Sequence, residues 1–325
     1  MTADRRPAGG DGESAAGPEP GPRSDAEPTA ETAADTRPKP DGGYETAPVV
    51  AHDGGSGTTA GQLLVVAETE YRLAVRSRWA VALTAIVTVF ALGMATFSGS
   101  DASPVGFDRV VASLSALVVY LVPLVALAFS YDAVVGREES GWLQTLFSLP
   151  VSRSRVVLGT AVGRAIVLAS ATVIGFGVAG ILLLLEYGFG GFDAYVGFLL
   201  AAVGLGLAFL AIGVCLSTLA REKTHALGLA LIAWAWFVLV HDLLALGVIG
   251  AFSLPDLAIS AMVVANPTGV FRALVLGALG AGGDAGFAAV LAAAGLSPAV
   301  LVAALLAWIG GPIALAAVAI RRRRV

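Results

Sequence analysis

Three histidines, His52, His225 and His241, and one cysteine, Cys215, are the residues of this chain best suited to metal or nucleophilic chemistry. They are far apart in the sequence, and none of the histidines begins an H-E-x-x-H motif, which disfavours a zinc protease. The chain has no G-x-x-x-x-G-K-[ST] sequence, so we expect it to have no nucleotide-binding loop of its own. A single cysteine excludes an intrachain disulfide and a cysteine metal cluster. We therefore predict that the chain is not an enzyme and that it holds no cofactor or metal.

An acidic pair followed by an apolar helix, within residues 131–155, has the composition of a docking segment. Glu138 and Glu139 precede a predicted short helix, where negative charge favours the helix dipole, and Pro150 ends it. Four large side chains fall on one face of this helix: Trp142, Leu143, Leu146 and Phe147. An exposed apolar and aromatic face fits a groove in a soluble partner protein. A plain interfacial helix would show the same periodicity, so the periodicity alone leaves both interpretations open.

A third feature is the pair His241-Asp242, which lies in the middle to outer part of an otherwise apolar segment. Charged groups inside a membrane span are costly, usually face the bundle interior and often mark functional sites. One interpretation is an ion- or proton-coupled carrier, and the other is a structural hydrogen bond to a neighbouring helix or a dimer partner. The structural interpretation is favoured because no second carboxylate lies in mid-span. We interpret Asp132, at the end of the second span, as a boundary residue rather than an ion-conducting site.

The elements that carry these residues are predicted to lie in a membrane. Hydrophobic residues make up 57% of the 325-residue chain and charged residues only 14%, against about 45–50% and 25% in soluble domains. A spanning helix needs about 20 largely apolar residues. Six segments qualify: Trp79–Phe97, Val110–Ser130, Ala165–Leu185, Ala194–Ala220, Ala226–Gly250 and Pro298–Ile320. We predict an all-α integral membrane protein with six transmembrane helices.

Three shorter apolar pieces, 257–264, 273–281 and 287–296, are interrupted by Pro, Asn, Arg or Gly. We predict that they are interfacial or extracellular elements within one long loop.

The basic residues predict the orientation of the spans. With a cytoplasmic N-terminus, the inside segments hold 13 basic residues, whereas the outside loops hold only Arg109 and Arg272. Because cytoplasmic loops carry the excess of Lys and Arg, both termini are predicted to be cytoplasmic in a multi-pass protein of the cell membrane. The run Arg321 to Arg324 is predicted to anchor the last helix among the lipid headgroups.

The first 60 residues differ from the rest of the chain. They hold 11 acidic and 5 basic residues, a net charge of −6, and 8 of the 15 prolines. Almost no large apolar side chains are present to offset the entropy of ordering, so residues 1–60 are predicted to be a disordered acidic tail rich in Pro and Gly.

An amphipathic helix is predicted just before the first span, over residues 62–78. Glu68, Arg72 and Arg76 recur every four residues on one face, with the glutamate on the favourable N-terminal side, and apolar residues share another face. The pattern fits a membrane anchor at the cytoplasmic surface or a partner-docking helix.

Residues 131–164 resemble the signature of ABC-2 type transporter permeases. In that family an acidic pair, a glycine, an apolar helix, an S-x-P-x-x-R sequence and a Gly-rich start of the third span build a cytoplasmic coupling helix. The matching positions are Glu138, Glu139, Gly141, Leu143, Leu146, Ser148, Pro150, Arg153 and Gly159. The resemblance extends over most of residues 61–325, which we predict to be the six-helix permease domain.

Further phrases resemble NosY-type permeases, which serve maturation of the copper enzyme nitrous oxide reductase beside an ATPase and a periplasmic β-helical protein. These phrases are Pro123–Leu127 before Tyr131-Asp132, Gly175-Phe176-Gly177, Asp242-Leu243, and Asn266-Pro267-Thr268 with Phe271-Arg272.

The resemblance implies a mechanism and partners. Two permease copies form a dimer, two ATPase subunits bind beneath them and hold the ATP, and the helix at 138–150 transmits ATPase closure to the spans. The implied coupling residues are Glu138, Glu139, Gly141, Trp142, Leu143, Leu146, Phe147, Ser148, Pro150 and Arg153. Gly204, Gly206 and Gly213 suit close helix approach at the dimer interface. Membrane lipid and an extracytoplasmic accessory protein are further expected partners, and nucleic acid is not.

Two other functions stay open at this point. One is a general ABC-2 exporter permease of drugs, lipids or ions. The other is a membrane tether or scaffold that presents the acidic tail or the 251–296 loop to other proteins.

Overall fold

The computed structural model describes residues 61, 67–69, 71–73, 78–98, 106–140, 152–252, 254–279 and 295–322. These residues form helices and short connections and include no strand, so the prediction of an all-helical protein is confirmed for them. The acidic tail, residues 1–60, lies outside the described residues. The elements are α2 (Trp79–Ser98), α3 (Gly106–Ser130), α4 (Val135–Glu139), α6 (Arg153–Tyr187), α7 (Phe192–Leu219), α8 (Lys223–Ala235), the π-helix η1 (Trp236–Val240), α9 (His241–Ala251), α10 (Asp256–Val264), α11 (Pro267–Ala278) and α13 (Pro298–Arg322).

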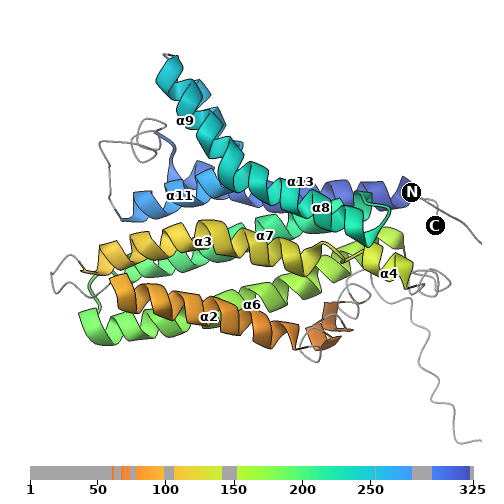
Figure 1. Cartoon of the computed structure of the whole chain (residues 1–325), viewed down its shortest axis with the longest axis horizontal. Helices are drawn as coiled ribbons and strands as arrows, with labels where there is room; N and C mark the ends of the chain where they lie inside the picture. The colour runs from red at the N-terminus through yellow and green to blue at the C-terminus, as the bar shows by residue number, and fades with distance from the viewer. Residues whose placement is uncertain are drawn as a thin grey trace, which may run out of the picture. The chain divides into compact units, whose positions relative to one another are not determined.

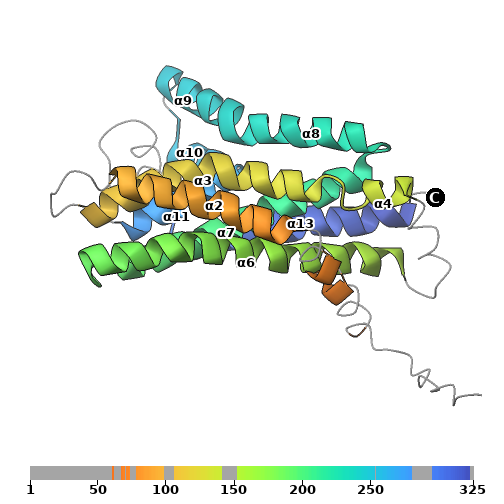
Figure 2. The same cartoon turned by 60° about the horizontal axis from the view of Figure 1, so that its bottom comes forward.

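Six helical segments of the described chain are long and apolar enough to cross a membrane, as the sequence predicts. Four of them are α2, α6, α7 and α13, and a fifth combines α3 with α4. The sixth is the continuous stretch of α8, η1 and α9, which spans 29 residues. Figure 2 shows α8 and α9 along one edge of the bundle, and in Figure 1 the helix changes direction between them.

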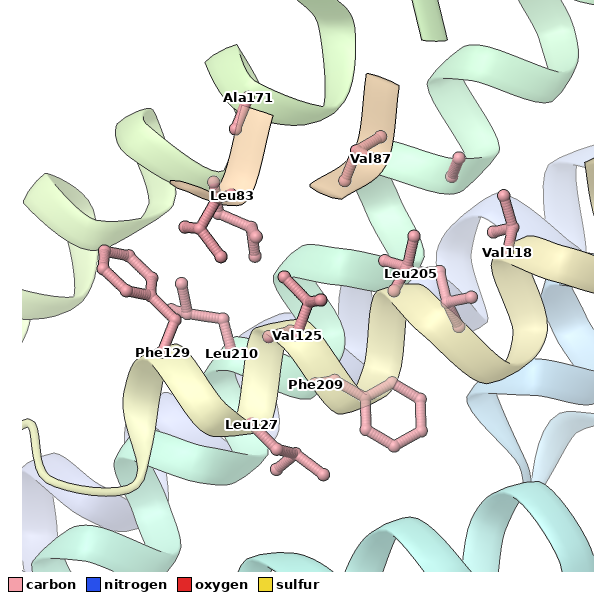
Figure 3. Close-up of a cluster of buried hydrophobic side chains, with 14 of the residues drawn as sticks. Leu83, Val87, Val118, Val125, Leu127, Phe129, Ala171, Leu205, Phe209 and Leu210 are labelled. Atoms are coloured by element: carbon pink, nitrogen blue, oxygen red, sulfur yellow. The ribbon is translucent and has the colours of Figure 1, made fainter. Parts of the chain in front are cut away.

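The helix α7 lies at the centre of the bundle, against α3, α6, α8, α11 and α13. In its most apolar stretch 67% of the residues are buried, against 22% in α2, in α8–α9 and in α13. Side chains of α7 meet those of α2, α3 and α6 in one core; the labelled members in Figure 3 are Leu83, Val87, Val118, Val125, Leu127, Phe129, Ala171, Leu205, Phe209 and Leu210. The helix α7 is thus the most buried of the six candidate spans, and the other helices pack around it.

The helix α6 begins at Arg153, twelve residues before the predicted start of the third span at Ala165. The predicted span starts only at Ala165 because Arg153, Arg155 and Arg164 interrupt the apolar run. A helix that extends beyond the hydrocarbon region can carry such residues at no cost, so hydropathy locates the spanning part and not the whole helix.

The glycines of α7 that were predicted to suit a dimer interface lie against side chains of their own chain. A β-carbon at Gly204 would lie 2.5 Å from a side-chain atom of Leu305 in α13, and one at Gly213 would lie 1.9 Å from Oγ of Ser130 in α3. Small residues in membrane bundles allow close helix approach, and here they do so around the central helix.

Substitution of Gly213 by alanine is therefore expected to destabilise the protein. The added methyl would overpack the contact with α3, which costs about 1–3 kcal/mol and lowers the apparent Tm in detergent by roughly 3–8 °C. The matched control is Gly228→Ala in α8, where nothing lies within 4 Å of the new β-carbon. A Gly213→Ala protein that unfolds at the same temperature as Gly228→Ala would contradict the packing described here.

The segment 254–279, which was predicted to be part of one long loop, is largely helical. It forms a helical hairpin, in which α10 and α11 are bent by 108° at a break of a few residues, as in a broken span or a re-entrant loop. Phe271 and Val275 of α11 belong to the main core, so α11 packs into the bundle. The interfacial or extracellular position of this hairpin stays a prediction. The third short piece, 287–296, lies almost entirely outside the described residues.

Of the predicted amphipathic helix at 62–78, the structure describes residues 67–69, 71–73 and 78. Arg72 and Glu68 form the predicted i,i+4 ion pair at 2.6 Å, with both side chains exposed. Arg78, in the left-handed region with φ of 60°, turns the chain into α2.

Candidate functional site

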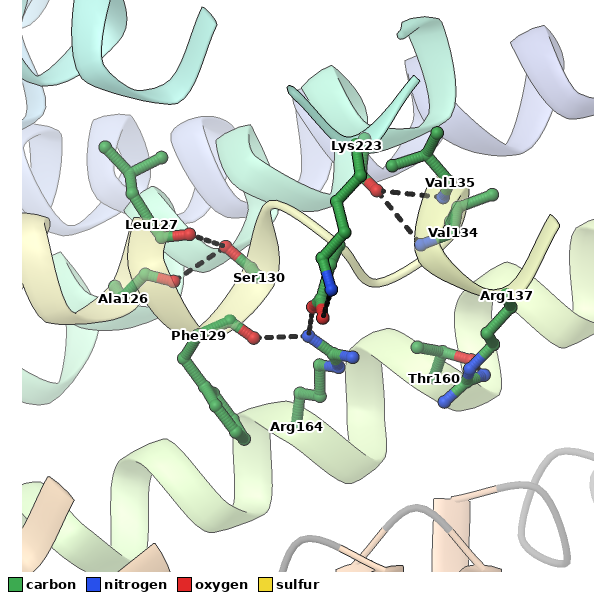
Figure 4. A network of polar contacts seen from close by, with 12 residues as sticks. Ala126, Leu127, Phe129, Ser130, Val134, Val135, Arg137, Thr160, Arg164 and Lys223 are labelled. Atoms are coloured by element: carbon green, nitrogen blue, oxygen red, sulfur yellow. Dashed lines mark hydrogen bonds and ion pairs between the residues drawn. The ribbon is translucent and has the colours of Figure 1, made fainter. Parts of the chain in front are cut away.

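A carboxylate in the turn between α3 and α4 joins three segments of the chain. Asp132 Oδ1 accepts a hydrogen bond from Arg164 Nη1 of α6 at 2.9 Å, and Asp132 Oδ2 lies 3.6 Å from Lys223 Nζ at the start of α8 (Figure 4). The Arg164 side chain is only 14% exposed, against 33% for Asp132 and 46% for Lys223. Asp132 is thus the counter-ion of a largely buried arginine.

Two aromatic residues just before Asp132 in the chain, Phe129 and Tyr131, contact these two cations. Arg164 Nη1 also donates to the carbonyl of Phe129, and its guanidinium lies 5.4 Å from the centre of the Phe129 ring. Lys223 Nζ lies 5.8 Å from the centre of the Tyr131 ring. Both distances are in the range of cation–π attraction, which adds to the charge pairing.

The start of α4 is bound to the end of α7. Ser217 Oγ, fully buried, accepts hydrogen bonds from the backbone N–H groups of Val134 and Val135, at 3.0 and 3.2 Å. The first N–H groups of a helix have no partner within that helix, so this hydroxyl supplies one for α4.

The rest of α4 is bound to α8 and α6. Glu139 Oε1 accepts from the backbone N–H of Lys223 at 2.6 Å and places a negative charge at the N-terminus of α8. Arg137 Nη1 donates to Thr160 Oγ1 of α6 at 2.6 Å. We call this set the α4 junction, and it consists of Asp132, Arg137, Glu139, Thr160, Arg164, Ser217 and Lys223. The α4 junction thus joins α4 and the turn before it to α6, α7 and α8.

Three of the ten predicted coupling residues lie in the described chain. Glu138 is half-buried on α4, Glu139 caps α8, and Arg153 is the first residue of α6. The other seven lie outside the described residues: Gly141, Trp142, Leu143, Leu146, Phe147, Ser148 and Pro150.

The partners of Glu139 and Asp132 were missed from the sequence, because they come from helices 30 to 90 residues away in the chain. The available signal was Arg164, a charge that directly precedes an uninterrupted apolar run, although a charge in that position ordinarily indicates only the orientation of a span.

A second polar cluster lies where α9 meets α11. Asn266, fully buried, uses its side-chain carbonyl to cap α11, accepting from the Thr268 N–H at 3.0 Å. Its amide nitrogen lies 2.8 Å from the Phe237 carbonyl, 3.0 Å from His241 Nδ1 and 3.3 Å from Asp242 Oδ1.

Asp242 is also paired with a cation. Its Oδ2 accepts from Nη1 of Arg272 on α11, and the two side chains are 13% and 21% exposed. We call His241, Asp242, Asn266, Thr268 and Arg272 the α9–α11 cluster. Sequence reasoning singled out the histidine and the aspartate but not their partners, although Asn-Pro is a strong signal for a helix start at Pro267. Among the described residues, no three His, Cys, Asp or Glu side chains lie close enough to hold a metal ion.

Comparison with known proteins gives the class of this molecule. A family profile described as "ABC-2 family transporter protein" matches residues 64–325, so the chain belongs to the ABC-2 transporter family, as the sequence resemblance indicated. Within that family the chain is similar to two proteins named "Probable ABC transporter permease protein NosY". The protein from Stutzerimonas stutzeri is 37% identical over 275 residues, which cover 81% of this chain and 99% of that protein. The protein from Pseudomonas aeruginosa is 36% identical over 272 residues, which cover 80% and 98%.

The chain is therefore a NosY-like permease subunit of an ABC transporter, and its relatives are transport components rather than catalysts. A permease of this class works with a separate ATPase subunit.

Proposed function

We propose that this chain couples ATP hydrolysis by a separate ATPase subunit to movement of its own membrane helices. The observation that carries the proposal is the α4 junction, since one short helix is bonded to α6, α7 and α8 at once. In this proposal the ATPase contacts the coupling segment at 138–150, and the junction distributes the resulting displacement over the bundle.

The charge distribution supports a cytoplasmic position for the α4 junction and both termini. Figure 1 shows α4, the start of α8 and the end of α13 at the same end of the bundle. Arg137, Arg153, Arg164, Lys223 and Arg321 all belong to this end, as the positive-inside rule requires of a cytoplasmic side. The proposed complex has two permease copies and two ATPase subunits, with ATP held by the latter.

We further propose that the complex serves maturation of nitrous oxide reductase, by transport or by a mechanical signal to an extracytoplasmic accessory protein. The similarity to NosY permeases over four fifths of the chain supports this assignment. Deletion of the gene in its host is expected to yield nitrous oxide reductase that lacks copper, measured by metal analysis of the purified enzyme. A fully copper-loaded enzyme would instead favour a general exporter.

Docking is tested by co-purification of the cognate ATPase with the permease. The double substitution L143D/L146D puts two charges on the predicted apolar face, and we expect it to abolish co-purification while membrane insertion persists. The matched control is L257D, which puts a charge on an exposed leucine of α10 outside the predicted docking segment. A L143D/L146D permease that retains its ATPase would show that this segment is not the docking site.

A further inference from the structure

The π-helix η1 releases one backbone carbonyl from its own helix. In an α-helix the N–H of His241 would bond to the carbonyl of Phe237, four residues earlier. Here it bonds to the carbonyl of Trp236, five residues earlier. The Phe237 carbonyl instead accepts from Asn266 Nδ2 at 2.8 Å and from Thr268 Oγ1 at 3.2 Å. Single π turns inside α-helices occur frequently at functional sites.

The π register of η1 and the hydrogen bonds that Asn266 and Thr268 donate to the Phe237 carbonyl depend on each other. An unsatisfied carbonyl at membrane depth costs several kcal/mol, so a Phe237 carbonyl that loses Asn266 and Thr268 needs another donor. In the α-helical register that donor is the N–H of His241, and taking it converts the π turn into an α turn. The segment thus has two hydrogen-bonded arrangements, one joined to the hairpin and one closed within the helix.

The change of register would separate α9 from α11. A π turn holds one residue more than an α turn, so its conversion rotates α9 by about 100° and shifts it by about 1.5 Å relative to α8. Asp242 is the second residue of α9, and the rotation carries it away from Arg272. The hydrogen bond from Asn266 to the Phe237 carbonyl and the Asp242–Arg272 ion pair are therefore lost together in the change of register.

The hairpin is held independently on its other side. Nε1 of Trp308, in α13, donates to the carbonyl of Val264 at 2.9 Å, which attaches the hairpin to α13. The same ring meets Phe237 of η1 edge-on with centres 5.3 Å apart, so α13 also contacts η1. The α10–α11 hairpin thus stays attached to α13 when α9 leaves it.

We propose that η1 and Asn266 form a conformational switch between α9 and the α10–α11 hairpin, closed in the π register and open in the α register. The switch extends the proposed function, because α8 begins at the α4 junction and leads directly into η1. It depends on the proposed function only for the force that ATP hydrolysis supplies. Both states of the switch are conformations of the permease itself and need no partner.

The test measures the distance between spin labels on the isolated permease in nanodiscs, without ATPase or ATP. Labels are attached at L243C in α9 and L257C in α10, whose leucines are 72% and 82% exposed, after Cys215→Ala has removed the native thiol. The labelled permease with Asn266 intact is expected to give one narrow distance distribution. Asn266→Ala is expected to shift the mean by several Å, with an upper bound of roughly 8 Å, because a label about 5 Å from the helix axis moves that far in a 100° rotation.

A deletion distinguishes the register switch from a loss of packing. Removal of Leu239 from η1 takes out the additional residue, so a plain α-helix then keeps α9 facing α11. The combination of N266A with this deletion is expected to restore the original distance distribution. Thr172→Val is the control, because that buried hydroxyl bonds only to the Leu168 carbonyl of its own helix among the contacts described, at 2.8 Å.

Two results would overturn the proposal: an unchanged distribution in Asn266→Ala, or a shift that persists after Leu239 is removed. If Asn266→Ala does not fold, Thr268→Val replaces it, with Thr268→Ser expected to keep the closed distance. Because these measurements need no partner, a failure of ATPase co-purification leaves their result unaffected and counts only against the proposed function.

Discussion

Substitution of Asp132 by asparagine is expected to lower the rate of ATP hydrolysis by the purified permease–ATPase complex about tenfold without releasing the ATPase. Asparagine keeps the size of the side chain but removes the charge that pairs with Arg164 and Lys223. A hydrogen bond between charged groups contributes about 1.5–3 kcal/mol, and about 1.4 kcal/mol corresponds to a tenfold change in population. The α4 junction would then transmit the displacement of α4 less completely to α6 and α8.

Two measurements accompany this prediction. The amount of co-purified ATPase reports docking, and the hydrolysis rate reports coupling. Ser115→Ala is the control, because that half-buried hydroxyl bonds to the Val111 carbonyl of its own helix, at 2.7 Å. A D132N complex with an unchanged hydrolysis rate would refute the role of the α4 junction. Loss of the ATPase itself would instead place Asp132 at the docking surface.

Removal of Arg272 alone is expected to destabilise the permease more than removal of Arg272 together with Asp242. Arg272→Met leaves the Asp242 carboxylate, 13% exposed, without its cation in an apolar helix. Breaking a buried pair from one side costs about 3–5 kcal/mol, whereas replacing both partners is often nearly neutral. The apparent Tm should therefore fall by roughly 6–12 °C in Arg272→Met and recover substantially in R272M/D242N.

The apparent Tm is compared at one heating rate, since unfolding of membrane proteins is commonly irreversible. Glu186→Gln, near the end of α6, is a charge-removal control for which no ion pair is described. If the double variant is less stable than Arg272→Met, the ion pair is not what holds α9 to α11.

Most of the spans could be predicted because lipid imposes a simple condition on sequence. About 20 apolar residues in succession are uncommon outside membrane spans, and the predicted Trp79–Phe97 and Pro298–Ile320 match α2 and α13 within two residues at each end. The fifth span was also found, but its π turn was not. A π turn in a uniformly apolar stretch depends on donors from α11, which no local pattern of α8 or α9 reveals.

The positions of α11 and the α4 junction could not be predicted for a related reason. The helix α11 is only 12 residues long and carries Arg272, so hydropathy assigns it to a loop although α7 and α13 cover it. Asp132 and Lys223 are 91 positions apart, and both ordinarily mark a membrane boundary. Whether two residues so far apart in the chain form an ion pair depends on which helices are neighbours in space. Here α3, α6 and α8 are brought together by packing against the buried helix α7. The glycines of α7 likewise suggested an interface between two copies of the chain, whereas Gly213 lies against Ser130 and Gly204 against Leu305 of the same chain.

The length of α6 has a consequence for how any soluble partner meets the membrane. Its 35 residues measure about 52 Å, whereas the hydrocarbon layer is about 30 Å thick. Because Arg153, Arg155 and Arg164 lie in its first twelve residues, roughly 20 Å of α6 projects from that end, which is more than the depth of the headgroup layer. A protein that binds beside Arg153 is thus held off the lipid surface, in water. Its affinity should respond to ionic strength more than to lipid composition.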